Sequence, residues 1–394
     1  MSNTLNEIAQ QLKVSDKKVQ LIYAFNGTGK TRLSREFKDL LEAEIEHDDE
    51  DDAGASELSR KNIIYYNAFT EDLFYWDNDL DGDTDRKLKI HPNAFTKWVL
   101  EDQGQDGTII NHFKRLTNSN VEPIFGSNFS DVKFTVIGDE QRSPVKISKG
   151  EESNLIWCVF YSFLEQIVEE LSNPIDGRST ADFNNLKYVF IDDPVSSLDD
   201  NHLIELAVDL AKLVKSCTAD LKFIITTHSP LFFNVLSNEF NNKFTSNPNA
   251  DPIVWTYRPG QAQRARLDKD INGRFSLTEL GGRTPFSYHL HLLSEIRVAI
   301  RNNQIRKYHF SFMRNILEKT TTFLGHDKWE NLLPKAADGN PDPFANRILN
   351  LSSHSAHAGE EIGEVEVNDK EKLEELVNFL SSEYGFWKQE AQNE

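Results

Sequence analysis

The chain has 394 residues, of which 38% are hydrophobic and 27% charged, enough for two or three domains with sizeable cores. The formal net charge of −20 argues against a broad nucleic-acid-binding surface, because unspecific affinity needs many lysine and arginine contacts to phosphates. The chain has only two cysteines, and its N-terminus lacks signal-peptide features. No apolar run approaches the ~20 residues that span a bilayer. We therefore expect a cytoplasmic protein without membrane contact.

A phosphate-binding loop is the first recognisable element. Residues 21–23 predict a strand and 32–42 a helix, with Ala-Phe-Asn-Gly-Thr-Gly-Lys-Thr between them. Such glycines let backbone N–H groups surround phosphates, while the lysine supplies a positive charge and the threonine hydroxyl reaches a magnesium ion. Ala24 replaces the usual first glycine, but the Gly-Lys-Thr end carries most of the chemistry. Against an ordinary strand-to-helix turn, we expect a nucleotide to be bound by Asn26, Gly27, Thr28, Gly29, Lys30 and Thr31.

A second motif, Ile-Ser-Lys-Gly-Glu-Glu-Ser at 147–153, precedes an apolar helical run over 155–163. One interpretation is a helix start, with Ser148 and Glu151 forming a capping box. The other is the signature motif of ABC-type ATPases, in which Ser148 and the Gly150 backbone would bind a γ-phosphate held by a second subunit. The position of the motif along the chain favours the signature and predicts at least a dimer.

The segment 187–199 predicts a buried parallel strand that ends in two adjacent carboxylates. We expect Asp192 to hold Mg²⁺ together with Thr31, and Asp193 to orient the attacking water. The alternative is a helix cap or a solvated loop, and this segment alone favours neither interpretation.

A third strand, over 223–227, ends at His228, which would contact the γ-phosphate. A hydrogen-bonded core histidine is the alternative. Phosphate loop, signature, acidic strand and histidine follow in the order of the ABC ATPases, so the sequence predicts an α/β fold with an ABC-type P-loop NTPase domain. Residues 66–69 lie where a glutamine loop is expected but contain no glutamine, and their role stays open.

The chain changes character after His228. Residues 252–257 and 276–278 predict a hairpin that closes the NTPase sheet, whereas apolar residues from 290 to 317 recur at helical spacing. We therefore expect an NTPase domain at 1–282 and a smaller, mostly α-helical domain at 283–394. Basic residues dominate 295–319, with phosphate-contact candidates at Arg297, Arg301, Arg306 and Lys307.

Arg314 and Glu318 are four residues apart, so both project from one face of a helix, and His354 lies in a small polar stretch. The plain alternatives are an exposed ion pair and a loop histidine. Metal-free RNA cleavage needs such a set, because a base must activate the 2′-hydroxyl, a cation must stabilise the phosphorane and an acid must protonate the leaving oxygen. The roles of His289, His291 and His357 stay open.

The whole chain resembles the bacterial PrrC-type anticodon nucleases. The tail motifs are the specific ones: Phe-Ser-Tyr-His-Leu-His-Leu at 286–292, Arg314-Asn315 with Glu318-Lys319, and Ser353-His354-Ser355. The resemblance also covers 21–35, 65–78, 148–153 and 188–207. It places Arg314, Glu318 and His354 on the catalytic triad of the family.

The resemblance implies a tRNA endoribonuclease with NTPase activity. Such ribotoxins cut lysine tRNA 5′ of the wobble nucleotide and leave a 2′,3′-cyclic phosphate and a 5′-hydroxyl. They serve phage defence and are held latent with a type I restriction–modification complex. Mg²⁺ with GTP or ATP, and a thymidine nucleotide (dTTP), are the implied cofactors, and the nuclease step is expected to need none. The segment 279–285 is shorter than in the family and lacks its aspartate, so lysine tRNA is an expectation inherited from the family.

Two other classes of function stay open on the motifs alone. An ABC-type DNA-repair or chromosome-maintenance ATPase would need no nuclease residues, although the chain shows no coiled-coil heptads of the kind that split such ATPases. A non-catalytic adaptor would use nucleotide only to dimerise and dock a partner.

Overall fold

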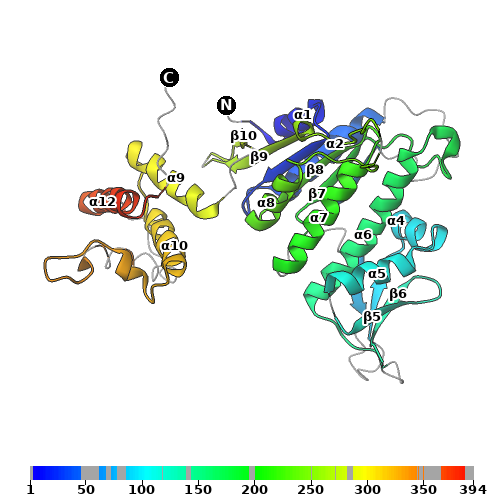
Figure 1. Cartoon of the computed structure of the whole chain (residues 1–394), viewed down its shortest axis with the longest axis horizontal. Helices are drawn as coiled ribbons and strands as arrows, with labels where there is room; N and C mark the ends of the chain where they lie inside the picture. Colours follow the sequence, from blue (N-terminus) through cyan, green and yellow to red (C-terminus); the bar gives the residue numbers. More distant parts are fainter. Residues whose placement is uncertain are drawn as a thin grey trace. The chain divides into compact units, whose positions relative to one another are not determined.

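The computed structural model describes residues 3–45, 62–67, 72–77, 86–117, 119–138, 143–194, 200–249, 251–270, 272–281, 287–343, 345, 349 and 365–386. The chain forms two compact units, Met1–Pro285 and Phe286–Glu394 (Figure 1). The domain boundary expected after residue 282 falls in 282–286, outside the described residues. In the ranges above, no helix combines the length and the apolar character needed to cross a membrane.

The first unit is built on a six-stranded sheet in the order β10-β9-β1-β8-β7-β2. Its strands are β1 (Val19–Tyr23), β2 (Ile63–Tyr66), β7 (Tyr188–Asp192), β8 (Lys222–Thr227), β9 (Ala262–Lys269) and β10 (Phe275–Glu279). All neighbours pair in parallel except β10, which is antiparallel to β9. Every residue of β1 and β7 is buried, as in parallel sheets covered on both faces. The predicted α/β fold and its three buried strands, β1, β7 and β8, are confirmed.

Helices cover both faces of this sheet (Figure 1). On one face α1 (Leu5–Val14) and α2 (Lys30–Ile45) share a core with the sheet, in which Phe37 meets Phe190 of β7. Side chains alternate along a strand, so Tyr23 points to the other face and packs edge-on against Phe233, with ring centroids 5.9 Å apart. Phe233 belongs to α8 (Pro230–Glu239), which packs beside α7 (Asp200–Ser216). This double cover fixes the strand ends that carry the candidate site.

A second, antiparallel sheet has the order β3-β4-β6-β5 and was not predicted. Its strands are β3 (Phe74–Asp77), β4 (Lys87–Ile90), β5 (Val121–Phe125) and β6 (Asp131–Val136). The neighbouring helices are α4 (Ala94–Lys97), the π-helix η1 (Trp98–Asp102), α5 (Asp106–Thr117), α6 (Lys149–Ser172) and the 3₁₀ helix η2 (Ile175–Gly177). The Trp76 indole N–H donates to Glu152 Oε2 at 2.7 Å and so ties β3 to the first turn of α6.

The hairpin that closes the large sheet lies later in the chain than predicted. Its second strand, expected at 276–278, is β10, but its first strand is β9, which follows the 3₁₀ helix η3 (Pro259–Gln261), and 252–257 is not a strand. The sequence of β9 is polar, with a buried arginine, Arg264. That guanidinium is satisfied by Ser237 and Asn241 at the end of α8 and beyond, at 2.8–3.0 Å. A polar strand has no apolar pattern to detect, and the side chains that bond its buried arginine lie more than 20 residues away in the sequence.

The second unit contains the helices α9 (Tyr288–Arg301), α10 (Lys307–Leu324), the 3₁₀ helix η4 (Trp329–Leu332) and α12 (Val367–Glu383). Leu293, Ile296, Met313 and Leu317 belong to its core, so the predicted helical spacing is confirmed for α9 and α10. Gly325, with φ of 70°, ends α10 in the left-handed conformation that glycine adopts without strain.

His309 lies in the first turn of α10, where protonation of its ring would break a backbone hydrogen bond. Its ring is buried, and its Nδ1 accepts a hydrogen bond from the Arg306 backbone N–H at 2.8 Å. Burial lowers the pKa of His309, so the folded unit favours the neutral ring that can accept this bond. The unfolded chain binds the proton more readily, and the stabilisation is therefore present above about pH 6.5 and lost as pH falls through the folded pKa.

We accordingly expect thermal unfolding to occur at lower temperature at pH 5 than at pH 7.5. His309→Gln keeps an acceptor but does not titrate, so it should show a smaller acid-induced fall than the wild type. Calorimetry of both proteins at the two pH values measures the difference. Equal falls would assign the acid sensitivity to other groups.

Candidate functional site

The phosphate loop lies where the sequence places it, between the end of β1 and the start of α2. Gly27 and Gly29 have φ of 78° and 110°, values that side chains rarely tolerate, and a Cβ at Gly27 would meet open space. The loop is thus free to turn its backbone N–H groups toward a ligand at the N-terminus of α2. Lys30 is only 7% exposed, and its Nζ donates to the Ala24 carbonyl and to Asn26 Oδ1, both at 3.3 Å.

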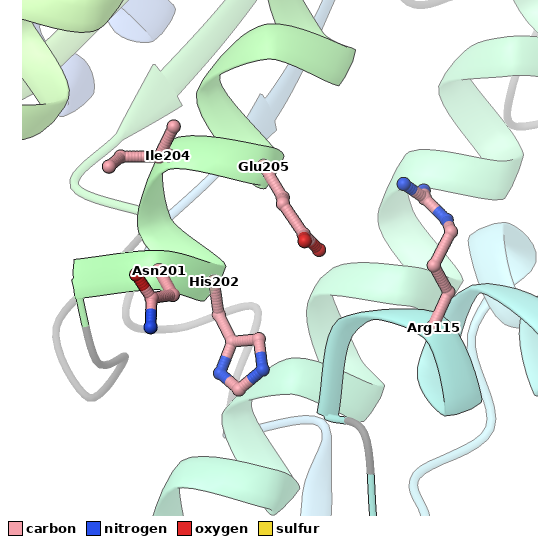
Figure 2. Close-up of a pocket in the computed structure, with 5 residues that line it drawn as sticks. All are labelled: Arg115, Asn201, His202, Ile204 and Glu205. Atoms are coloured by element: carbon pink, nitrogen blue, oxygen red, sulfur yellow. The ribbon is translucent and has the colours of Figure 1, made fainter.

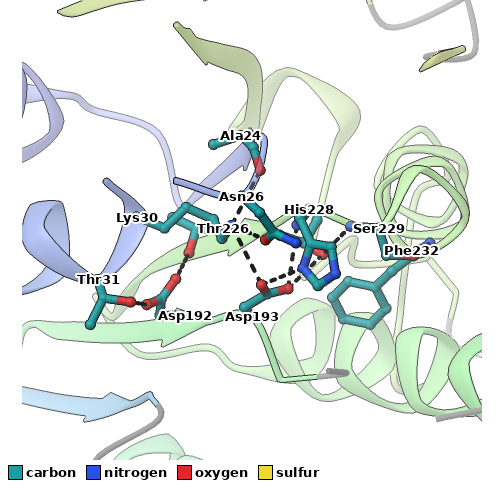
Figure 3. Close-up of polar contacts among 11 residues, drawn as sticks. Ala24, Asn26, Lys30, Thr31, Asp192, Asp193, Thr226, His228, Ser229 and Phe232 are labelled. Atoms are coloured by element: carbon teal, nitrogen blue, oxygen red, sulfur yellow. Dashed lines mark hydrogen bonds and ion pairs between the residues drawn. The ribbon is translucent and has the colours of Figure 1, made fainter. Parts of the chain in front are cut away.

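Asp193 connects the phosphate loop to the end of β8 (Figure 3). Its Oδ2 lies 3.5 Å from Lys30 Nζ and also pairs with the His228 ring, while its Oδ1 accepts from the His228 backbone N–H at 3.3 Å. Burial alone would raise the pKa of Asp193, but the His228 hydrogen bond and the Lys30 charge lower it overall. The φ of 54° at Asp193 is an uncommon backbone conformation that these contacts hold in place. Lys30, Asp193 and His228 therefore form one charged cluster.

Asp192 is the second carboxylate of the site and is 3% exposed. Thr31 Oγ1 donates to its Oδ2 at 2.7 Å and Thr226 Oγ1 to its Oδ1 at 2.5 Å. Burial raises the pKa of Asp192, and the two hydroxyl bonds only partly offset this effect. A buried carboxylate beside a hydroxyl offers the oxygen ligands that Mg²⁺ prefers, so Thr31 and Asp192 fit the metal of a nucleotide complex.

The signature residues lie at the N-terminus of α6. Ser148 accepts from Glu151 N at 3.2 Å, and Glu151 Oε2 accepts in turn from Ser148 N at 2.8 Å, which completes the predicted capping box. Gly150 is in the first turn of the helix. Within the described ranges, no hydrogen bond or ion pair joins Ser148 or Gly150 to the cluster of Lys30, Asp192, Asp193 and His228.

In the second unit, α10 brings Arg314 and Glu318 together as the spacing predicts. Arg314 Nε donates to Glu318 Oε1 at 2.8 Å, and its guanidinium carbon lies 5.6 Å from the centroid of the Trp329 ring. A guanidinium held between a carboxylate and an aromatic face has a fixed orientation. His354, the third residue predicted for this site, lies outside the described residues, as does His357.

His289 of α9 lies next to the same helix. Its Nε2 is 3.0 Å from Asn315 Oδ1, directly beside Arg314 in the sequence. Burial lowers the pKa of His289, and the neighbouring Lys319 charge lowers it further, whereas the Asn315 bond opposes both. The neutral ring is therefore favoured at this position.

Sequence reasoning missed Thr226 and Trp329, and it named Asn315 only as part of the Arg314-Asn315 motif, without its contact to His289. Thr226 lies near the end of a predicted strand, directly before Thr227 and His228, and this position could have indicated that its hydroxyl bonds to Asp192. Trp329 follows a turn after α10 and Asn315 meets a histidine 26 residues away, so neither contact has a local pattern.

A separate pocket of about 580 Å³ lies between α5 and the start of α7 (Figure 2), and none of the predicted site residues lines it. Its lining consists of Arg115, Asn201, His202, Ile204 and Glu205. Arg115 forms an ion pair with Asp209 at 2.5 Å, and Glu205 adds a further negative charge. This charge balance does not favour a phosphate ligand, and we assign the pocket no role.

The comparisons with known proteins bear on both units. A model of a family described as an AAA domain matches residues 130–381, which include Ser148, Asp192 and His228. The chain is 48% identical to the Escherichia coli protein named Anticodon nuclease, over 100% of both chains. The match to the SMC head domain from Thermotoga maritima covers 68% of this chain and 91% of the SMC chain, at 13% sequence identity. The TM-score of this match is 0.29, and it supports no further argument. The 48% identity between this chain and the E. coli protein, over the full length of both, shows that this chain belongs to the anticodon nuclease family.

Proposed function

We propose that this protein is a nucleotide-gated anticodon nuclease that cleaves tRNA, with lysine tRNA as the expected substrate, 5′ of the wobble nucleotide. The observation that carries the proposal is the Arg314–Glu318 pair, held at 2.8 Å beside Trp329 on the surface of α10. Glu318 is half-exposed and Arg314 about one quarter exposed, so an RNA strand can reach both.

The chemistry follows from these groups. Glu318 removes the proton of the 2′-hydroxyl, and the 2′-oxygen attacks the adjacent phosphorus. Arg314 stabilises the negative charge of the phosphorane, and His354 gives a proton to the 5′-oxygen as its bond to phosphorus breaks. The products are a 2′,3′-cyclic phosphate and a 5′-hydroxyl, and no metal ion takes part.

The first unit is proposed to regulate this cleavage. Asn26, Gly27, Thr28, Gly29 and Lys30 would hold the phosphates of GTP, ATP or dTTP. Thr31 and Asp192 would bind the accompanying Mg²⁺, which would neutralise phosphate charge. Asp193 would orient the water, and His228 would donate a hydrogen bond to the γ-phosphate.

Assembly is part of the proposal. Ser148 is exposed and Gly150 half-buried, and among the described residues neither is bonded to the phosphate loop of its own chain. This supports a γ-phosphate shared between two copies, and hence at least a dimer. A type I restriction–modification complex is the proposed silencing partner, and phage defence in the cytoplasm is the proposed setting.

The test is to incubate the wild type and His354→Ala with total bacterial tRNA, Mg²⁺ and GTP, and to map new RNA ends by their phosphate chemistry. We expect a cut in an anticodon loop, with a cyclic phosphate, that His354→Ala slows by about 10²–10⁴-fold. The assay is repeated with dTTP in place of GTP, because the activating nucleotide is part of the question.

Nucleotide binding by both proteins is the control for folding. A cut with a 3′-hydroxyl end, or one that His354→Ala leaves intact, would contradict the proposed chemistry. DNA-stimulated hydrolysis that is indifferent to Arg314, Glu318 and His354 would instead point to a DNA-repair ATPase.

A further inference from the structure

The first turn of α6, which follows the signature residue Ser148, is bound at two points by the small antiparallel sheet. Trp76 of β3 donates its indole N–H to Glu152 Oε2 at 2.7 Å. Ser119, two residues before β5, donates its hydroxyl to Glu151 Oε1 at 2.9 Å. Glu151 also closes the capping box on Ser148. Two consecutive glutamates next to the signature are therefore held by opposite edge strands of one sheet.

The contact at Glu152 is charged and nearly buried. The residue is 7% exposed, and its second oxygen, Oε1, accepts from Lys149 Nζ at 2.8 Å. The Trp76 ring is held as well, because its centroid lies 5.9 Å from that of Phe134 on β6 and 5.7 Å from Lys146 Nζ. A hydrogen bond to a charged group that is shielded from water is stronger than a neutral, exposed one. The Trp76–Glu152 bond therefore fixes the start of α6 relative to the small sheet.

The packing of α6 does not require this carboxylate. From Leu155 onward the helix buries a run of apolar residues, and its first turn already has a capping box. A nearly buried carboxylate loses its hydration, whereas an apolar side chain at this position could pack against the indole without that cost. A hydrogen bond, unlike an apolar contact, weakens steeply when donor and acceptor turn away from each other. The Trp76–Glu152 bond thus contributes direction to the start of α6 more than stability.

We propose that Trp76 and Ser119 are positioning residues that orient Ser148 and the Gly150 backbone toward the nucleotide of a second copy, so that the small sheet controls nucleotide-dependent dimerisation. The inference rests on the shared γ-phosphate proposed above and adds to it the residues that align the signature. Within the described part of the chain, neither Trp76 nor Ser119 bonds to the charged cluster around Lys30. Binding of nucleotide by a single copy should therefore not depend on them.

The experiment measures dimerisation of the full-length protein by sedimentation velocity, over a range of protein concentrations, with Mg²⁺ and non-hydrolysable analogues of GTP, ATP and dTTP. Trp76→Phe keeps a ring against Phe134 but removes the N–H, and should raise the half-dimerisation concentration about tenfold. Ser119→Ala removes the second bond and should shift it in the same direction. Tyr75→Phe is the matched control, because Tyr75 is 42% exposed on β3 and points to the opposite face of the sheet. This control should dimerise like the wild type.

A second measurement distinguishes positioning from a general effect on the fold. Nucleotide affinity is measured for each protein at concentrations where it is monomeric, together with its thermal unfolding without ligand. We expect Trp76→Phe and Ser119→Ala to bind nucleotide as monomers like the wild type. If both variants lose monomer affinity in proportion to dimerisation, the residues support the fold and the positioning role is wrong. If Trp76→Phe fails to fold, Ser119→Ala decides the question.

The outcomes separate this inference from the proposed function. If the wild type dimerises with nucleotide and both variants dimerise at the same concentration, the small sheet does not position the signature, and the shared γ-phosphate stands. If the wild type binds nucleotide but stays monomeric with all three analogues, the proposed assembly itself fails, and the positioning role with it.

Discussion

Arg314→Ala is expected to slow RNA cleavage at saturating substrate by about 10²–10³-fold, which is the usual cost of removing one preorganised group that stabilises transition-state charge. The guanidinium is held by Glu318 at 2.8 Å and by the Trp329 ring, so its orientation is set before RNA binds. Arg314→Lys keeps the charge but loses the planar fork and should recover only part of the rate. Single-turnover cleavage of lysine tRNA by the three proteins measures the effect.

Arg301→Ala provides the control for this experiment. Arg301 is an exposed arginine at the end of α9 and a candidate phosphate contact. Its loss should weaken RNA binding and reduce the salt dependence of binding, but should leave the rate at saturation near that of the wild type. A rate for Arg314→Ala within a factor of a few of the wild type would remove Arg314 from the chemical step.

Asp192→Asn is expected to separate stability from nucleotide binding. Burial raises the pKa of Asp192, which means that the fold disfavours its charge, and an asparagine can still bond to Thr31 and Thr226. The variant should therefore unfold at a temperature at least as high as the wild type without ligand. Its affinity for the Mg²⁺–GTP complex should fall by about 100-fold or more, because the carboxylate proposed to bind the metal is lost.

Thermal unfolding with and without Mg²⁺–GTP measures both effects. Nucleotide at about 100 times its Kd stabilises a binding protein by about 2.7 kcal/mol, and Asp192→Asn should lose most of that gain. Asp268→Asn, which changes a half-buried carboxylate paired with Arg266 on β9, should retain it. A full ligand-induced shift in Asp192→Asn would show that Asp192 is not the metal ligand.

The sequence predicted those parts of the NTPase unit whose information is local. The strands β1, β7 and β8 are buried on both faces, so their composition alone identified them, and the Ser148–Glu151 spacing identified the start of α6. The strand β9 was missed because its buried Arg264 is satisfied by residues far away in the chain. The small antiparallel sheet was missed because its strands are short and mix buried with more exposed side chains, and because loops separate them.

The same contrast holds for the candidate sites. The contact between Arg314 and Glu318 was predicted from helical spacing, and the positions of Asp192 and Asp193 from the end of a strand. Contacts that join distant elements, such as Trp329 with Arg314, depend on how the helices pack. No spacing rule contains that information.

The helix α6 has a mechanical consequence for any signal that begins at Ser148. Its 24 residues form a rod of about 36 Å, so a tilt of about 5° moves the far end by about 3 Å. Near its middle, the Tyr161 hydroxyl donates to the Asp209 carbonyl of α7 at 3.2 Å, and Glu165 pairs with His112 of α5 at 2.8 Å. These links couple three helices, so a displacement of Ser148 would be transmitted as a rotation of a rigid block rather than absorbed by one flexible segment.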